Sequence, residues 1–238
     1  MTGKGEEQFL PNFLRAVTAP GLEGSRCIFK VIRRVPQLHP ISPGSRRDIK
    51  MTGRGMRLPT RDEELGHAAL AFLKLNPSGF VMLVDDLEHN RRGIAGAVFE
   101  RYRQALDGVL NEWRWRASVH FLVNMLEAYY FADPNALKEV LGLKIDDHDV
   151  DVESIRHPKN DIRSQFPGFN EIEHGNLIAC RIDLEIVLDH PKRCTSLRSM
   201  IAWCSKALGR RDGHRFQLLE GLQWTVTSGQ KDQLPAAE

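Results

Sequence analysis

The hydrophobic and polar positions along the chain follow two periods, one typical of strands and one typical of helices. Short runs of apolar and β-branched residues predict strands at 27–35, 79–84 and 118–123. Apolar residues at helical spacing predict helices at 6–18, 61–75, 92–112 and 134–142. Since the runs at 79–84 and 118–123 are continuous, they are typical of strands buried on both faces. Strands that alternate with helices indicate an α/β domain with a mostly parallel sheet.

The pattern changes after Gly142. Residues 144–161 are rich in Asp and His and poor in apolar residues, and from about 162 the chain again has helical periodicity. Further helices are expected at 170–178, 181–189, 195–208 and 215–222. We therefore expect an α/β domain at 1–142, an acidic loop and helical extension packed on it at 143–224, and a flexible tail at 225–238.

Composition places the chain among ordinary globular proteins. It has 238 residues, of which 42% are hydrophobic and 27% charged, and a chain of this length can bury a core without disulfides or a structural metal. No run of 18 apolar residues predicts a membrane span, and the first residues have no apolar signal segment. Its four cysteines are widely spaced, which favours reduced thiols in the cytoplasm and argues against a zinc ribbon.

Positive charge is concentrated in the first 60 residues. These hold eleven Lys and Arg against four Asp and Glu, although the whole chain has a net charge of only +2. Part of the excess lies in a predicted basic loop at 36–60, which is rich in proline and glycine and includes Arg46, Arg47, Lys50 and Arg54. Such a cationic segment favours a nucleic-acid partner, because it can neutralise the phosphate backbone.

The strongest chemical motif is VMLVDDLE at 81–88, where a predicted buried strand ends in Asp85, Asp86 and Glu88. Ligands of open α/β sheets bind beyond the carboxyl ends of the strands, and clustered carboxylates suit a hard cation such as Mg²⁺. Asp86 and Glu88 are two residues apart and point the same way while the chain stays extended. The alternative is that these acids only favour the dipole of the next helix.

Two further segments carry candidate carboxylates. In TGKGEE at 2–7, Lys4 and the neighbouring glycines are suited to a phosphate, and Glu6 and Glu7 follow. A loose start before an acid-capped helix explains TGKGEE equally well. Glu127 comes three residues after the predicted strand 118–123, among apolar neighbours, so it needs a partner or a shifted pKa. Asp133 precedes a proline and is interpreted as a helix N-cap.

Three other segments contain residues that can carry chemistry. The run 146–161 lacks the spacing of a calcium loop and is interpreted as a solvated acidic loop. Within HPKND at 157–161, Lys159 is a candidate phosphate ligand and His157 has a setting that suggests catalysis. WRWR at 113–116 mixes residues that can stack on bases, but a helix end that packs its tryptophans is favoured. Motifs of serine hydrolases, zincins and Rossmann dehydrogenases do not occur.

Taken in order, GKGEE, VMLVDDLE, NMLEAYYFAD, HPKND and CTSLRSMIAWC resemble domain-of-unknown-function family 4276 (DUF4276), over roughly residues 2–208. This family resembles the Toprim domains of overcoming-lysogeny-defect nucleases, topoisomerases and primases. The resemblance implies a Toprim-like, mostly parallel sheet flanked by helices. It also implies a bacterial protein linked to anti-phage defence and encoded near ATPases.

The Toprim pattern assigns roles to residues of this chain. Asp85, Asp86 and Glu88 match the acid cluster that holds Mg²⁺ (or Mn²⁺), and the pattern's glutamate would be a general acid or base. Thr2 stands at that glutamate's position, so Glu6 or Glu7 is expected to replace it, with Glu127 in support. Lys4, Lys159 and the basic loop would bind phosphates. The resemblance thus implies a Mg²⁺-dependent, nuclease-like phosphodiester enzyme; the alternative is an inactive Toprim-like subunit that binds an ATPase partner or a nucleotide. A small-molecule phosphoesterase or nucleotidyltransferase is a weaker third possibility.

Overall fold

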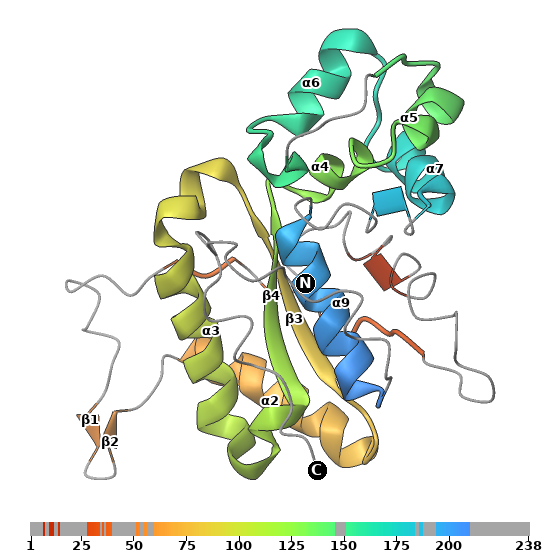
Figure 1. Ribbon diagram of the computed structural model, residues 1–238. Helices are drawn as coiled ribbons and strands as arrows, with labels where there is room; N and C mark the ends of the chain where they lie inside the picture. The colour runs from red at the N-terminus through yellow and green to blue at the C-terminus, as the bar shows by residue number, and fades with distance from the viewer. Residues whose placement is uncertain are drawn as a thin grey trace.

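The computed structural model describes residues 60–145, 151–183, 186–187 and 194–209. It also describes shorter pieces before residue 60, namely Glu7, Leu10, Pro11, Leu14, 28–33, Val35, 37–39, 51–52 and 55–56. The fold is mixed α/β: a pair of parallel strands runs through the middle, with helices on both faces (Figure 1).

The central strands are β3 (Val81–Leu87) and β4 (Ala117–Val123), paired in parallel from Val81 opposite Ala117 to Leu87 opposite Val123. All of β4 is buried, as expected for a strand covered on both faces. The strands predicted at 79–84 and 118–123 are therefore confirmed. β3 continues through Asp85 and Asp86, because these residues still pair with Phe121 and Leu122 of the buried neighbour.

One face of the strand pair is covered by α2 (Thr60–Leu75) and α3 (Ala95–Leu110). Side chains of a strand alternate between faces, and Leu83 and Leu87 of β3 join the core on this side. The two helices approach closely at Gly66. A Cβ atom added there would lie 2.5 Å from Val109 Cβ and 2.6 Å from the carbonyl oxygen of Ala105, both of α3. Glycine is therefore what allows α2 to pack directly on α3.

The opposite face is covered by α9 (Thr195–Ala207), whose buried Trp203 lies against the strand pair. Its ring centroid is 5.9 Å from that of Phe80 and 5.8 Å from that of His120, which projects from β4. His120 is fully buried, so its pKa is lowered to about 3, with the charge of Arg103 adding to the effect of burial. The imidazole is thus a neutral part of the core.

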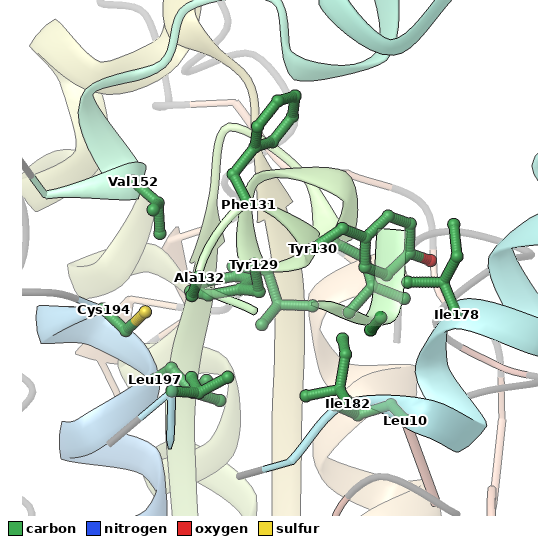
Figure 2. Packing of buried hydrophobic residues seen from close by; sticks show 14 of the residues in the cluster. Leu10, Tyr129, Tyr130, Phe131, Ala132, Val152, Ile178, Ile182, Cys194 and Leu197 are labelled. Carbon is green, nitrogen blue, oxygen red and sulfur yellow. The ribbon is translucent and has the colours of Figure 1, made fainter. Parts of the chain in front are cut away.

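A helical layer lies beyond the carboxyl ends of the strands (Figure 1). It consists of α4 (Leu126–Tyr130), α5 (Pro134–Leu141), η4 (Val152–Ser154), α6 (Pro158–Gln165) and α7 (Glu173–Arg181). Figure 2 shows Tyr129 and Tyr130 of α4 among the apolar side chains that join this layer to α9 and to Leu10. The Asp133 carboxylate accepts hydrogen bonds from the amides of Asn135 and Ala136, so the predicted N-cap is confirmed.

The single helix predicted at 92–112 is wrong in its bounds. A 3-10 helix, η2 (His89–Ile94), precedes α3, and another, η3 (Asn111–Arg116), follows it. α3 ends because Asn111 has a φ of 49°, outside the helical range. In η3 the guanidinium of Arg116 lies over the rings of Phe80, Trp113 and Trp115, as expected for a helix end that packs its tryptophans.

The strand predicted at 27–35 is absent among its described residues. Residues 28–33 and Val35 are not in a strand; with Phe80–Val84 they line a cavity of about 360 Å³ instead of pairing with β3. β-branched residues favour a strand, but a strand forms only where a neighbouring strand is there to pair with it. The predicted loop 36–60 contains the short antiparallel pair β1 (Met51–Thr52) and β2 (Gly55–Met56).

Candidate functional site

The acid motif lies where β3 and β4 end side by side, at the edge covered by the helical layer. Because side chains alternate along a strand, Asp85 and Asp86 point to opposite faces. Asp85 faces the α3 side with Leu83 and Leu87, and Asp86 faces the α9 side with Met82 and Val84. The two neighbouring acids therefore have different surroundings.

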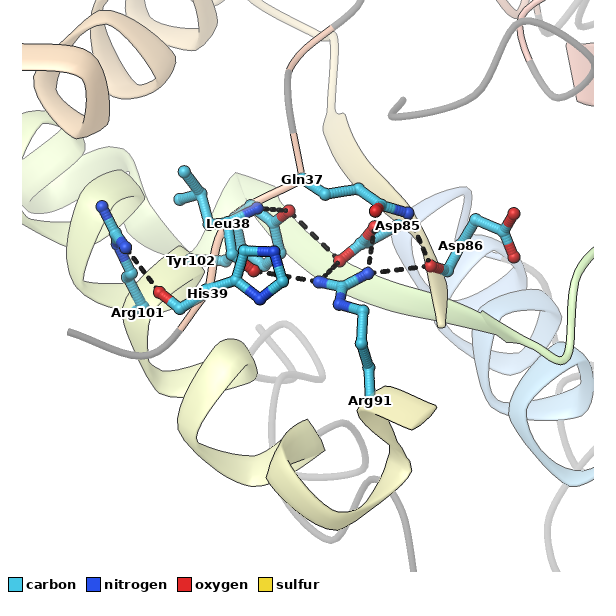
Figure 3. Close-up of polar contacts among 8 residues, drawn as sticks. All are labelled: Gln37, Leu38, His39, Asp85, Asp86, Arg91, Arg101 and Tyr102. Carbon is cyan, nitrogen blue, oxygen red and sulfur yellow. Dashed lines mark hydrogen bonds and ion pairs between the residues drawn. The ribbon is translucent and has the colours of Figure 1, made fainter. Parts of the chain in front are cut away.

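Asp85 is fully buried and forms a bidentate ion pair with Arg91 of η2 (Figure 3). Arg91 Nη2 lies 2.8 Å from Asp85 Oδ2, and Nη1 lies 3.2 Å from Oδ1. The Tyr102 hydroxyl donates to Oδ2 at 3.1 Å. Burial alone would lower the pKa of Arg91, but the hydrogen bond and charge of Asp85 outweigh it, and the pKa is raised. Asp85 is thus committed to an internal ion pair.

The side chains of Arg91 and Tyr102 also hold the segment 37–39 at the end of β3. Arg91 Nη2 donates to the Leu38 carbonyl at 2.9 Å, and the Leu38 amide donates to the Tyr102 hydroxyl at 3.0 Å. Gln37 Nε2 and Arg91 Nη1 both donate to the backbone carbonyl of Asp86, at 3.0 and 2.9 Å. Burial, and then the charge of Asp85, raises the pKa of Tyr102, so the phenol stays protonated and keeps donating.

Three other carboxylates were expected at this edge. Figure 3 shows the Asp86 side chain turned away from the Arg91 guanidinium. Glu88 is exposed and lies between the end of β3 and η2, with a φ of −59° and a ψ of 155°. Glu127 is buried in the first turn of α4, just after Asn124 and Met125, which have φ of 58° and 73°.

Cationic side chains gather at the same edge. His89 and Arg92 come from η2, and Arg156 and His157 from the turn that leads into α6. The ring centroids of His89 and His157 are 6.4 Å apart. Arg92 donates a hydrogen bond to the Glu153 carbonyl at 3.4 Å, so η2 also contacts the segment that leads to Arg156. Partial burial lowers the pKa of His89, and the charges of Arg156, Arg92 and His157 act in the same direction. His89, Arg92, Arg156 and His157 are called the cationic cluster below.

A buried glutamate in η4 joins β4 to the helices. The Glu153 carboxylate accepts hydrogen bonds from the Tyr129 hydroxyl at 3.0 Å, from the Ser196 amide at 2.8 Å and from the Ser196 hydroxyl at 3.0 Å. Its backbone carbonyl accepts from Asn124 Nδ2 at 2.8 Å. Burial and the neighbouring Asp151 raise the pKa of Glu153 to about 8, although the hydrogen bonds act in the opposite direction. Glu153 therefore holds the site's supporting elements together.

Of the remaining predicted site residues, the structure describes Glu7 and Lys159. Glu7 is helical and half-buried. Lys159 forms an ion pair with Glu171, which also binds Arg163 at 3.2 Å, so its ammonium is engaged by a carboxylate. Six predicted residues lie outside the described parts of the chain: Lys4, Glu6, Arg46, Arg47, Lys50 and Arg54.

The donor set of the acid motif bears on the expected Mg²⁺. Across the described residues, no three His, Cys, Asp or Glu side chains come together as a metal site. Asp85 is held by Arg91, whereas the Asp86 side chain is turned away from that guanidinium and Glu88 is exposed. Mg²⁺ commonly binds one or two carboxylates and takes its other ligands from water and substrate phosphates. Asp86 and Glu88 therefore fit a weakly held Mg²⁺ and not a preformed three-carboxylate site.

The sequence patterns missed the partners that define this edge. Arg91, Tyr102 and Glu153 make its shortest buried polar contacts, and none of them lies in a recognisable motif. A signal existed for Arg91, since a charged residue six positions after Asp85 can return to it once η2 reverses the chain direction. Nothing in the sequence relates Glu153 to Ser196, which is 43 residues away.

Comparisons with known proteins gave one match. A family model described as a domain of unknown function (DUF4276) matches residues 3–203. Neither the curated proteins nor the solved structures contain a match to the chain. Within the described parts of the chain, no helix has the length and apolar character needed to cross a membrane.

Proposed function

The chain belongs to the DUF4276 family, and from this premise we propose that it is a Toprim-like, Mg²⁺-dependent phosphodiester enzyme that acts on nucleic acid. A nuclease in bacterial anti-phage defence is the form of this activity that the family resemblance favours. The proposal includes a cytoplasmic location, which the wide spacing of the four cysteines favours.

The observation that carries the proposal is the meeting of two kinds of charge at one strand end. The carboxylates of Asp86 and Glu88 follow β3 directly, and the cationic cluster begins at the next residue, His89. Phosphoryl transfer needs groups that hold a cation and groups that hold the phosphate anion. Both kinds converge beyond the carboxyl ends of parallel strands, where α/β proteins bind their ligands.

In this proposal Asp86 and Glu88 hold the metal, and Asp85 positions the strand end through Arg91. A bound Mg²⁺ would polarise the phosphate and lower the pKa of attacking water. Glu127 lies in the first turn after β4 and supports the site as a second carboxylate. Glu6, or in its place Glu7, is proposed as the general base, and Lys4 and the loop residues Arg46, Arg47, Lys50 and Arg54 as contacts to the nucleic-acid backbone.

Metal titration tests the proposal directly. Mg²⁺ or Mn²⁺ is titrated by calorimetry into the wild type, Asp86→Asn and Glu88→Gln, and the same proteins are assayed on plasmid, linear and single-stranded substrates. We expect saturable millimolar binding by the wild type, a loss of about tenfold or more in each variant, and cleavage that falls by about 100-fold.

Asp85→Asn is the matched control for neighbouring position and charge. In this proposal its effect on metal binding is small at temperatures where it remains folded, because Asp85 faces Arg91. If the folded wild type bound no metal at millimolar concentrations and cleaved none of the substrates, the proposed enzyme would be ruled out.

The engagement of Asp85 favours a second candidate, a Toprim-like subunit that cuts nothing and binds an ATPase partner or a nucleotide. With one acid of the motif held in a buried ion pair, the edge has fewer carboxylates than the Toprim pattern uses. The two candidates differ in the metal titration. Nucleotide binding that persists in Asp86→Asn, without any metal-dependent cleavage, would favour the subunit.

A further inference from the structure

The cationic cluster brings together side chains that are far apart in the sequence. η2 follows β3 and carries His89 and Arg92, while Arg156 and His157 lie at the turn before α6. The two imidazole rings are 6.4 Å apart and inclined at 66°. Helical packing thus brings the two rings together immediately beyond Glu88, with Arg92 three residues after His89 in η2 and Arg156 next to His157.

The positive charge of this cluster has little compensation from the protein. Arg92 donates one long hydrogen bond, 3.4 Å, to the Glu153 carbonyl, and its charge also acts on Asp151. The buried Nδ1 atom of His89 has no hydrogen-bond partner among the described residues. Over the same part of the chain, no ion pair within 4.0 Å involves any of the four side chains.

Neighbouring cations on α6 behave differently. Lys159 and Arg163 share the carboxylate of Glu171, and Arg163 is exposed. Among the described residues, the protein therefore pairs these surface cations with a carboxylate, but leaves Arg92 and Arg156 without one within ion-pair distance. An anion from outside would supply the missing partner, and guanidinium groups are suited to phosphate because their N–H donors match its oxygens.

We propose that the cationic cluster binds a phosphate group, and that its physiological source is the backbone of a nucleic acid. The inference rests on the proposed function, because it assigns the substrate phosphate to the face of the site next to Asp86 and Glu88. It does not depend on a metal. Arg156 and His157 are exposed and hold the phosphate from the α6 side, and Arg92 and His89 hold it from the η2 side.

Binding without metal tests this assignment. A fluorescently labelled single-stranded DNA 12-mer is titrated with protein in EDTA and followed by anisotropy, and inorganic phosphate is added as competitor. We expect Arg156→Gln and His157→Asn each to weaken binding by about five- to tenfold, and the double variant more. The slope of log affinity against log salt should fall by about 0.7 for each lost phosphate contact.

Arg163→Gln is the matched control, since it removes an exposed arginine of α6 that already pairs with the carboxylate of Glu171. Because Arg163 is expected to make no phosphate contact, the affinity of this variant for the 12-mer should be within about twofold of the wild type. Arg156 and His157 are exposed, so their variants should keep the wild-type unfolding midpoint, which circular dichroism checks.

The outcomes separate the two phosphate sources and the two proposals. If phosphate competes with the 12-mer and the cluster variants lose 12-mer binding, the result supports the nucleic-acid backbone as ligand. Tight phosphate binding without any 12-mer binding would overturn that source. Equal binding by wild type, Arg156→Gln and His157→Asn would overturn the site itself. If the cluster variants lose binding but no variant or wild type shows metal-dependent cleavage, the phosphate site stands and the proposed enzyme fails.

Discussion

At the scale of single residues, the two adjacent acids of the motif have different surroundings. Asp85 and Asp86 have the same side chain and are adjacent in sequence, yet only Asp85 is fully buried against Arg91 and Tyr102. Removing one partner of a buried ion pair leaves an uncompensated charge, whereas replacing both partners with apolar residues is often tolerated. The contribution of Asp85 should therefore be to stability.

Asp85→Asn is expected to lower the free energy of unfolding by about 3–5 kcal/mol, because the guanidinium of Arg91 stays buried without its carboxylate. Asp86→Asn, on the opposite face of the strand, should lower the free energy of unfolding by less than about 1 kcal/mol. Urea unfolding followed by tryptophan fluorescence measures both. The double variant Asp85→Leu with Arg91→Met should recover part of the loss, and an Asp85→Asn protein as stable as wild type would contradict the structural role.

At the scale of elements, the close packing of α2 on α3 outweighs intrinsic helix propensity at one position. Gly66 lies within α2, where alanine would be favoured by about 1 kcal/mol in an isolated helix. A Cβ atom at Gly66 would meet Val109 Cβ at 2.5 Å and the Ala105 carbonyl at 2.6 Å, and backbone cannot move aside cheaply. Overpacking of this kind costs about 1–3 kcal/mol, so the packing term exceeds the propensity term.

Gly66→Ala should therefore destabilise the protein by about 1–2 kcal/mol in spite of the better helix former. Gly96 provides the control, because it lies in α3 with nothing within 4 Å of an added Cβ atom. Gly96→Ala should stabilise by about 0.5–1 kcal/mol. Thermal unfolding of both variants checks the signs, and a stabilising Gly66→Ala would mean that α2 and α3 are not in close contact.

At the scale of the whole molecule, Glu153 connects α4 and α9 through its buried carboxyl group, and its backbone carbonyl binds Asn124 just after β4. The pKa of Glu153 is raised to about 8 from an ordinary value of 4.5, so the folded state keeps a proton that the unfolded state releases. The stability from this group is complete below pH 4.5 and is lost as the pH rises towards 8. His120 acts oppositely, because its pKa is lowered to about 3 and its protonation opposes folding below pH 6.5.

Between pH 6.5 and 8 the effect of Glu153 can be isolated from that of His120. The free energy of unfolding of the wild type should fall by up to about 1.4 kcal/mol per pH unit in this window, more steeply than that of Glu153→Gln. Urea titrations at pH 6.5, 7.2 and 8.0 compare the two slopes. Parallel slopes would show that the donors from Ser196 and Tyr129 keep the carboxylate ionised throughout.

Taken together, the elements were largely predictable and their partnerships were not. Hydrophobic runs determined β3 and β4, helical spacing determined α2, α5 and α9, and Asp133 before a proline determined an N-cap, because these depend on neighbours within a few residues. Tertiary structure decided that residues 28–33 do not pair with β3, and that Asp85 turns to Arg91 while Asp86 turns away. It also brought the ring of His157 to 6.4 Å from that of His89, 68 positions earlier. Contacts of this kind depend on which faces meet after packing, and a local pattern carries no information about the other side of the contact.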